Sequence, residues 1–467
     1  MRIAGSMKAV RPPTGAVGWL RRMCAMCCSV QIKEVDRDPN SIQSQGTALL
    51  PVRLLDEPSQ SRVLKIRGDF PILSRRINDR SVVYFDNACM SLRPKAVVEA
   101  INGYYLEYSG CAGREAHHFG ATTTRAYASA REAVQQYIGA RRSSEILFVR
   151  NTTEGINIVA NILPFKPGDA VLCSDIEHNS NLLPWQILRQ RKGVDHRIFH
   201  TAPDTTFDWD SFRRKLDGSV KLVAIPHTSN LSGVTFPVKD IIREAHRVGA
   251  LVLIDAAQGM LYRDIDVQEL DADFLAFSGH KMLGPTGSGV LYAKEALLKT
   301  LPCFLVGGET VLDTTYTDFT LGDAPDRFEA GLQDYAGAIG LAAAISYLDS
   351  IGGKAIKKQV HELNSLATEE LSKTKGIKLI GPRDPGQRTG ILNFCVEGMA
   401  PSDVSYLLNQ GANIMTRSGR HCVHSWYNAR GLSGSIRASF SFYNTPEEVE
   451  FFVWTLRDII RLYAKAG

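Results

Sequence analysis

The sequence predicts an α/β protein built on a mostly parallel sheet, and two observations support this prediction. Short, continuously apolar segments alternate with helical patterns, as expected of buried strands joined by helices that cover both faces of a sheet. Polar residues and glycines gather directly after several of these strands. In such sheets ligands bind at the carboxyl ends of the strands, so a binding site is expected at that edge.

The composition excludes several classes of function. The 467 residues carry a formal net charge of +5, with 44% hydrophobic and 22% charged residues, which is ordinary for a soluble globular protein. The chain has no Lys/Arg-rich run and no basic patch interleaved with aromatic residues, so we expect no nucleic-acid partner. No apolar run approaches the ~18–20 residues of a membrane helix, so we expect no membrane association.

Nine cysteines are scattered along the chain. An odd, dispersed set in a long chain argues for reduced thiols, and hence for a cytosol or an organelle matrix rather than secretion. Cys24, Cys27 and Cys28 form a cluster that could bind a metal or take part in redox chemistry. No second ligand pair at a zinc-like spacing accompanies the cluster, so we expect no metal site.

Residues 1–61 differ from the rest and are interpreted as an N-terminal tail, disordered or targeting. The first acidic residue is Glu34, and several arginines and lysines precede it. An Arg-bearing start without acidic residues resembles an organelle transit peptide. The alternative, an unstructured tail or an upstream start codon, is slightly favoured. We therefore expect a cytoplasmic protein, or an organelle-matrix protein if residues 1–33 are a transit peptide.

Hydrophobic periodicity places the elements of a large domain within residues 77–349. The strands are expected at 82–85, 146–149, 170–174, 220–225, 251–254, 274–277 and 290–293. The helices are expected at 94–108, 123–138, 156–162, 184–190, 239–248 and 335–351. The stretch 301–332, rich in Gly, Asp and Thr, is expected to be less regular.

A smaller domain is expected from residues 62–76 together with 350–467. Its helices are expected at 354–374 and 402–410, and its strands at 377–380, 390–396 and 435–440, with a loop at 416–435. The sequence also predicts where a last helix begins, because Thr445 and Glu448 form a capping box and Pro446 suits the first helical position.

One lysine is placed for covalent chemistry. Lys281 follows the strand 274–277 in a glycine-rich loop that also holds Ser278 and His280. Glycines let the backbone approach a ligand closely, and a lysine among small residues at a strand end is placed to form a Schiff base. Considered alone, this residue is better interpreted as a solvated loop lysine, because lysine is mostly exposed.

Hydroxyl side chains begin the helical pattern after the strand 146–149. Thr152 and Thr153 stand where a side-chain oxygen caps a helix, and capping is the simpler interpretation. The free N–H groups and the helix dipole at such a position also favour phosphate.

The convergence of such residues at strand ends overturns the simpler interpretations. In a parallel sheet the carboxyl ends of the strands share one edge, so residues that follow them meet there. The residues that follow strand ends are Thr153, His178, Asp255, Gln258 and 278–281.

Six short motifs occur together in this chain. They are Asp86-Asn-Ala, Thr152-Thr-Glu-Gly-Ile-Asn157, Glu177-His178, Leu253-Ile-Asp255-Ala-Ala-Gln258, Phe277-Ser-Gly-His-Lys281 and Ile436-Arg437-Ala-Ser. Together they resemble the class V aminotransferase family, which uses pyridoxal 5′-phosphate (PLP). Two further motifs are similar to the SUF-type (group II) cysteine desulfurases and selenocysteine lyase-like enzymes, namely Arg417-Ser-Gly-Arg-His-Cys422 and Arg437-Ala-Ser-Phe-Ser-Phe-Tyr-Asn-Thr445.

The resemblance covers about residues 65–465 and implies a fold-type I PLP-dependent transferase. By resemblance, Lys281 holds the cofactor and moves protons, Asp255 pairs with the pyridinium nitrogen, and His178 stacks on the ring. Gln258 is expected at the phenolic oxygen and Asn230 near the ring. The phosphate is expected to be held by Thr152, Thr153, Ser278 and His280. The substrate is expected to be bound by Arg437, whose guanidinium suits a carboxylate, and by Arg417 and Asn181.

Cys422 is the reactive cysteine that the resemblance implies. Arg417, Arg420 and His421 stand close to it in the sequence, and cationic neighbours favour the thiolate, which is the nucleophile. The implied reaction converts L-cysteine to L-alanine and leaves a persulfide on Cys422, for a sulfur-acceptor protein of Fe–S cluster assembly or another sulfur pathway. The family also implies a homodimer.

Several residues depart from the SUF-type pattern. Leu332 stands where the second subunit usually offers a threonine to the PLP phosphate, and Arg420 replaces the usual second histidine before the nucleophile. Two alternatives stay open. One is another class V outcome, such as a selenocysteine lyase, an epimerase or an aminotransferase, and the other is a non-catalytic scaffold. The presence of Cys422 together with Lys281, Asp255 and His178 favours desulfuration.

Overall fold

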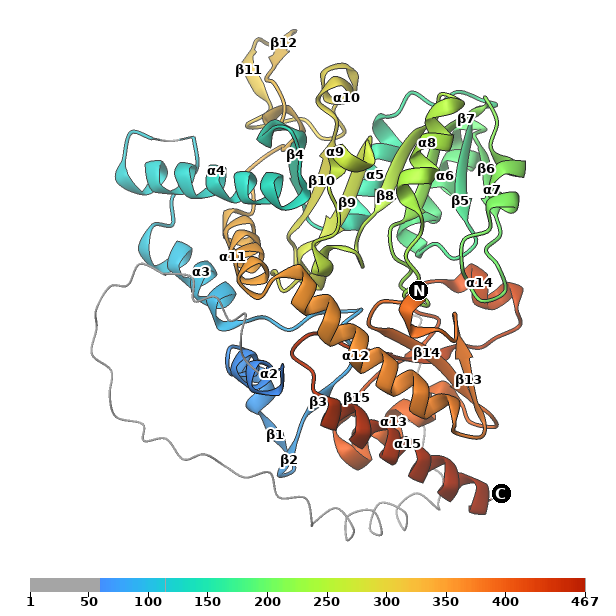
Figure 1. Ribbon diagram of the computed structural model, residues 1–467. Coiled ribbons are helices and arrows are strands. Elements are labelled where there is room, and N and C mark those ends of the chain that lie inside the picture. Colours follow the sequence, from blue (N-terminus) through green and yellow to red (C-terminus); the bar gives the residue numbers. More distant parts are fainter. Residues whose placement is uncertain (1–58, 114, 467) are drawn as a thin grey trace, which may run out of the picture.

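The computed structural model describes residues 59–113 and 115–466 and centres on a seven-stranded sheet (Figure 1). Its strands are β4 (Ile146–Val149), β5 (Ala170–Ser174), β6 (Asp195–Phe199), β7 (Val220–Pro226), β8 (Leu251–Asp255), β9 (Phe274–Ser278) and β10 (Gly289–Ala293). They follow the order β4-β10-β9-β8-β7-β5-β6. Strands β5 to β9 are parallel, whereas β10 is antiparallel to both its neighbours. The predicted α/β class with a mostly parallel sheet is therefore confirmed.

Apolar side chains of this sheet alternate between two cores, as the period of two along a strand requires. On β5, Leu172 belongs to one core, whereas Val171 and Cys173 belong to the other. The first core also receives α4 (His118–Ile138), α8 (Val238–Arg247) and α11 (Tyr335–Ile351), and the second receives α5 (Thr152–Ile162) and α6 (Leu183–Lys192). The remaining helices of this part are α3 (Lys95–Glu107), α7 (Trp209–Lys215), α9 (Val267–Leu270) and α10 (Glu295–Thr300).

The C-terminal part forms a separate sheet with its own core. Its strands are β13 (Ile377–Ile380), β14 (Ile391–Val396), β16 (Arg417–Gly419) and β17 (Ser435–Ser439), in the antiparallel order β13-β14-β17-β16. Its helices are α12 (Gly353–Ser372), α13 (Pro401–Ala412), α14 (His424–Ala429) and α15 (Pro446–Ala466). The capping box of α15 is confirmed, because Glu448 N donates to Thr445 Oγ1 at 3.2 Å and Thr445 N donates to Glu448 Oε2 at 3.1 Å.

An early strand belongs with this C-terminal part. β3 (Val83–Tyr84) pairs in parallel with β15 (Ile414–Met415), and Ser439 N donates to Phe85 O at 2.7 Å. Val83 and Phe85 also lie in the core of the C-terminal sheet. The division into a large and a small domain stays a proposal, and this pairing supports moving the start of the large domain beyond residue 85.

Some elements were not predicted. α4 begins at His118 rather than at residue 123, because His117 Nδ1 accepts a hydrogen bond from Gly120 N and caps the helix. The irregular stretch contains a hairpin of β11 (Val311–Thr314) and β12 (Phe319–Leu321). The other short elements are α2 (Ser59–Gly68), β1 (Arg76–Ile77), β2 (Arg80–Ser81), η1 (Pro71–Ser74), η2 (Ser143–Glu145), η3 (Asn179–Asn181), η4 (Met260–Tyr262), η5 (Gly279–Lys281), η6 (Asp326–Phe328) and η7 (Pro385–Gln387).

A buried carboxylate anchors the segment after this hairpin to the large sheet. Glu329 Oε1 and Oε2 accept from the Arg131 guanidinium at 2.7 and 2.8 Å. Phe148 N at 2.6 Å and Tyr127 Oη at 2.8 Å complete the set of donors. The charge is thus fully matched inside the fold, which is the condition under which a buried ion is tolerated.

The predictions about the tail, the cysteine cluster and the transit peptide within residues 1–58 lie outside the described residues. Within 59–113 and 115–466, no single helix combines the length and apolar character needed to cross a bilayer. Only α11 and α12 taken as a pair, bent by 77°, satisfy that test by length and composition.

Candidate active site

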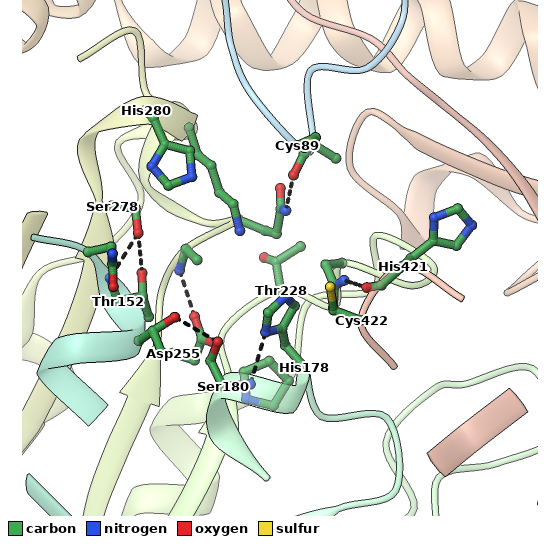
Figure 2. Close-up of a pocket in the computed structure, with 18 of the residues that line it drawn as sticks. Cys89, Thr152, His178, Ser180, Thr228, Asp255, Ser278, His280, His421 and Cys422 are labelled. Carbon is green, nitrogen blue, oxygen red and sulfur yellow. Dashed lines mark hydrogen bonds between the residues drawn. The ribbon is translucent and has the colours of Figure 1, made fainter. Parts of the chain in front are cut away.

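A cavity of about 240 Å³ lies at the carboxyl edge of the large sheet, where the loops of the C-terminal sheet meet it (Figure 2). Twelve of the thirteen predicted site residues line it. They are Thr152, Thr153, His178, Asn230, Asp255, Gln258, Ser278, His280, Lys281, Arg417, Cys422 and Arg437. Parallel pairing of β5, β7, β8 and β9 brings the ends of these strands together, as the sequence pattern predicted.

An amine and a carboxylate enter the cavity from neighbouring strands. Lys281 ends η5, directly after β9, and Asp255 is the last residue of the adjacent β8. Burial raises the pKa of Asp255, while Lys281 opposes that rise. Burial likewise lowers the pKa of Lys281, while Asp255 opposes that fall. Each group therefore favours the charged form of the other in a poorly solvated space.

Hydroxyl groups gather at the N-terminus of α5. Ser278 Oγ lies 2.7 Å from Thr152 Oγ1 and accepts from Thr152 N at 2.8 Å, and Thr153 Oγ1 lies 2.7 Å from Ser180 Oγ. The capping role that the sequence left open belongs to Asn151, whose side chain accepts from Glu154 N at 3.0 Å. The threonine hydroxyls thus face the cavity, at a helix end that favours an anion.

His178 is held as a neutral ring. Its Nδ1 accepts a hydrogen bond from Ser180 N at 3.0 Å, so the ring proton of the neutral form is on Nε2. Burial, followed by the charges of Lys281 and Arg437, lowers the pKa of His178 to about 3. At neutral pH the ring therefore carries an N–H donor and no charge.

Cys422 stands in a tight turn clamped to the large sheet. His421 and Cys422 both have left-handed backbones, with φ of 48° and 59°. The carbonyl of Cys422 accepts from Asn179 N at 2.7 Å, and the carbonyl of His421 accepts from Asn230 Nδ2 at 2.7 Å. Figure 2 shows the sulfur of Cys422 within the same close-up as His178 and Thr228.

Two arginines supply positive charge on the side of the C-terminal sheet. Arg437, on β17, is only 2% exposed, and its Nη1 donates to Asn230 O at 2.8 Å. Arg437 Nη2 and Arg417 Nη1 lie 3.7 and 3.8 Å from the carboxylate of Asp86. Arg437 Nε is buried without a partner among the residues that the structure describes, so this fork has an open donor.

Comparison with known proteins agrees with this geometry. Residues 83–452 match the family described as Aminotransferase class-V. The chain belongs to the class-V aminotransferase family. It is 38% identical over 403 residues to a probable cysteine desulfurase of Synechocystis sp., covering 85% of this chain and 96% of that protein. It is 40% identical over 408 residues to a cysteine desulfurase of Salmonella agona, covering 86% and 98%.

Solved structures of the same family share the fold. A cysteine desulfurase from Thermococcus onnurineus NA1 in its apo form has a TM-score of 0.82 at 38% identity, covering 85% of this chain and 98% of that one. The cysteine desulfurase CsdA from Escherichia coli has a TM-score of 0.79 at 33% identity, covering 86% and 98%. These likenesses confirm the fold-type I architecture expected from the sequence.

The cofactor of this family is PLP, and the residues of the cavity fit it. The N-terminus of α5 presents hydroxyls that are not used for capping, which suits a phosphate. The amine of Lys281 and the carboxylate of Asp255 stand at adjacent strand ends, which suits an aldehyde and a ring nitrogen.

One predicted residue is not brought into the cavity. Asn181 is fully buried beneath it, where its Nδ2 donates to Glu177 Oε2 at 2.7 Å and its Oδ1 accepts from Trp185 Nε1 at 3.3 Å. The amide is engaged on both sides, and the structure does not bring Asn181 to the cavity at which the resemblance implied substrate binding. Its neighbour Ser180 lines the cavity instead.

Three residues at or beside the cavity received no role from the sequence, namely Ser180, Thr228 and Asp86, and Cys89 was expected only near the mouth of the site. Ser180 and Thr228 line it and follow β5 and β7, so the strand-end rule could have found them. Asp86 and Cys89 follow β3, which reaches the site only because it pairs with β15. No local pattern signals that pairing.

We predict that the free energy of unfolding falls as the pH decreases from 6.5 toward 4, and that His178→Gln reduces this fall. The pKa of His178 is about 3 in the folded protein, against about 6.5 in an unfolded chain, so the unfolded state binds the extra proton in this window. Urea unfolding at several pH values measures the slope. The exposed His361→Gln serves as a control. Equal slopes for His178→Gln and wild type would contradict the prediction.

Proposed function

We propose that this protein is a PLP-dependent cysteine desulfurase, which converts L-cysteine to L-alanine and leaves the sulfur on Cys422 as a persulfide. The observation that carries the proposal is the clamped turn of Cys422 at the cavity that also contains Lys281 and Asp255. A nucleophile facing a buried amine and a buried carboxylate is the arrangement that this chemistry needs. Support also comes from the relatives, which are named cysteine desulfurases.

The cofactor, when bound, supplies an electron sink for charge that develops on the substrate. We assign its attachment and the movement of protons to Lys281, and its ring nitrogen to Asp255. His178 and Gln258 are assigned to its ring, with Asn230 nearby. The phosphate is assigned to Thr152, Thr153, Ser278 and His280.

Arg437 is assigned to the substrate carboxylate. Its guanidinium is buried, and burial lowers its pKa, while the carboxylate of Asp86 opposes this effect at 3.7 Å. The open Nε donor gives a carboxylate the second point of a bidentate contact. Arg417, partly exposed and beside the same Asp86, adds a second positive charge to this wall.

Cys422 then acts on the sulfur of L-cysteine. Its thiolate attacks that sulfur, the S–S bond forms, and the bond between this sulfur and the β-carbon breaks. The β-carbon takes up a proton and becomes the methyl group of alanine. His178, with its proton on Nε2, and Lys281 are the proton-carrying groups that we assign to this transfer.

Two kinds of partner belong to the proposal. A homodimer is supported by exposed apolar side chains along the hairpin and the segment before it, where Val306, Leu312 and Phe319 are 66%, 75% and 64% exposed. Such surfaces are typical of contacts between chains. A sulfur-acceptor protein of Fe–S cluster assembly, or of another sulfur pathway, is the second partner, because a persulfide must be unloaded before the next turnover.

We predict that the purified protein is yellow and that borohydride fixes the cofactor on Lys281. The amine of this residue is the lysine nitrogen that lines the cavity beside Asp255. Peptide mapping of the reduced protein locates the adduct, and Lys281→Ala provides the matched control without it. An adduct on another lysine would show that the assignment is wrong.

We predict that Cys422→Ala abolishes persulfide formation and lowers alanine release from L-cysteine by orders of magnitude, since the nucleophile is lost. Cofactor absorbance is expected to remain, because Lys281 and Asp255 lie in the other sheet. Alanine analysis and mass spectrometry measure both effects. Wild-type desulfuration by the variant would refute the role of Cys422, and activity retained only on selenocysteine would favour a selenocysteine lyase.

We predict a homodimer at micromolar concentration, measured by multi-angle light scattering. Leu312→Asp together with Phe319→Asp is expected to weaken it, because charges placed in an apolar contact lose hydration. The same double change on exposed Leu64 and Tyr406, outside the hairpin, serves as the control. A fully active wild-type monomer would contradict the proposal.

A further inference from the structure

Cys89 shares the cavity with Cys422, and the proposed desulfuration gives it no role. Six cysteines fall in the part of the chain that the structure describes, and only Cys89 and Cys422 among them line the cavity. Cys173 is fully buried in the sheet. Cys111 does not line the cavity, and its Sγ lies 3.8 Å from Tyr335 Oη. Two thiols that can be reached from one space raise the question of sulfur transfer between them.

A guanidinium contacts the sulfur of Cys89. Arg417 Nη1 donates to Cys89 Sγ at 2.6 Å. Arg417 begins β16, and the same strand leads into the turn that carries Cys422. A charged donor stabilises negative charge on sulfur, and a sulfur anion is both the nucleophile and the leaving group of persulfide exchange.

The backbone around Cys89 is fixed, so its thiol stands on a rigid wall of the cavity. Ala88 N donates to Ser439 Oγ at 2.9 Å, and Ala88 O accepts from Gln258 Nε2 at 2.7 Å. Cys89 N donates to Asp86 O at 3.0 Å. The buried Arg437, with its open Nε, lines the same cavity and adds a second cation for a sulfur anion.

The two sulfurs also act on one common group. Negative charge on either Cys89 or Cys422 raises the pKa of Lys281, which places both side chains within electrostatic reach of the same amine. A persulfide extends the side chain of Cys422 by one S–S bond of about 2 Å, toward the space that the two residues share.

We propose that Cys89 is a second sulfur carrier, which takes the terminal sulfur of the Cys422 persulfide inside the cavity. This inference rests on the proposed desulfurase function. The thiolate of Cys89 attacks the outer sulfur, a new S–S bond forms on Cys89, and the old S–S bond breaks to release Cys422 as a thiolate. No oxidant or reductant is consumed, and Cys422 is restored for another substrate. Each chain therefore stores two transferable sulfurs before any acceptor protein arrives.

The test supplies the reduced holoenzyme with two equivalents of L-cysteine per chain, without other thiols. Samples are quenched with iodoacetamide at successive times, and alanine is quantified beside peptide masses. In wild type we expect an added sulfur atom on the Cys422 peptide first and on the Cys89 peptide later, with two alanines per chain. In Cys89→Ser we expect alanine to stop near one per chain, a twofold loss. Cys111→Ser, half-buried outside the cavity, is expected to keep two.

The outcomes separate this inference from the function on which it rests. No added sulfur on either peptide of wild type would overturn the desulfurase proposal itself. Sulfur on Cys422 alone, with one alanine per chain, would overturn the role of Cys89 and leave the desulfurase intact. Sulfur on Cys89 in Cys422→Ala would overturn the transfer step. The first alanine could form more slowly in Cys89→Ser while wild type never carries added sulfur on Cys89. That result would overturn the carrier role and leave Cys89 only the role of positioning Arg417.

Discussion

Burial of charge at the carboxyl edge of the large sheet is the constraint on which the site depends. Lys281, Asp255 and Arg437 face one cavity. Desolvation raises the pKa of Asp255 and lowers the pKa of Lys281 and Arg437, so it favours the neutral form of each group. Charges withdrawn from water raise the free energy of the folded state unless partners reach them. A cofactor with an aldehyde and a ring nitrogen, together with a substrate carboxylate, would supply such partners, so their binding would offset the cost of desolvation. Affinity and fold are therefore linked at this edge.

The contrast with a second buried charge shows why this edge is functional rather than structural. Glu329 meets donors from Arg131, Tyr127 and Phe148, so its charge is satisfied inside the protein. Arg437 is equally buried but keeps an open Nε and only distant carboxylate contact. A fully matched ion holds a segment in place, whereas an incompletely matched one beside a cavity is available to a ligand.

The sequence predicted those parts of the site that local patterns determine. Apolar strands followed by polar loops placed Lys281 and Asp255 at one edge, because parallel pairing leaves few other arrangements. Asn181 does not reach the cavity, because its amide is buried against Glu177 and Trp185, whereas its neighbour Ser180 lines the cavity. Cys89 was expected only near the mouth of the site, since its position on the cavity wall depends on the pairing of β3 with a strand more than 300 residues later. β6 was not predicted because Asp195, His196 and Arg197 break its apolar pattern.

The backbone at Cys422 shows how the two sheets contribute to one cavity. His421 and Cys422 are consecutive non-glycine residues in the left-handed region, which costs roughly 1–2 kcal/mol for each residue. Hydrogen bonds from Asn179 and Asn230 to their carbonyls offset that cost, and both asparagines follow strands of the large sheet. Asn230 also accepts from Arg437, so one asparagine touches both the nucleophile turn and the group assigned to the substrate carboxylate. Groups that follow strands of the large sheet therefore hold the turn that carries Cys422 at the cavity.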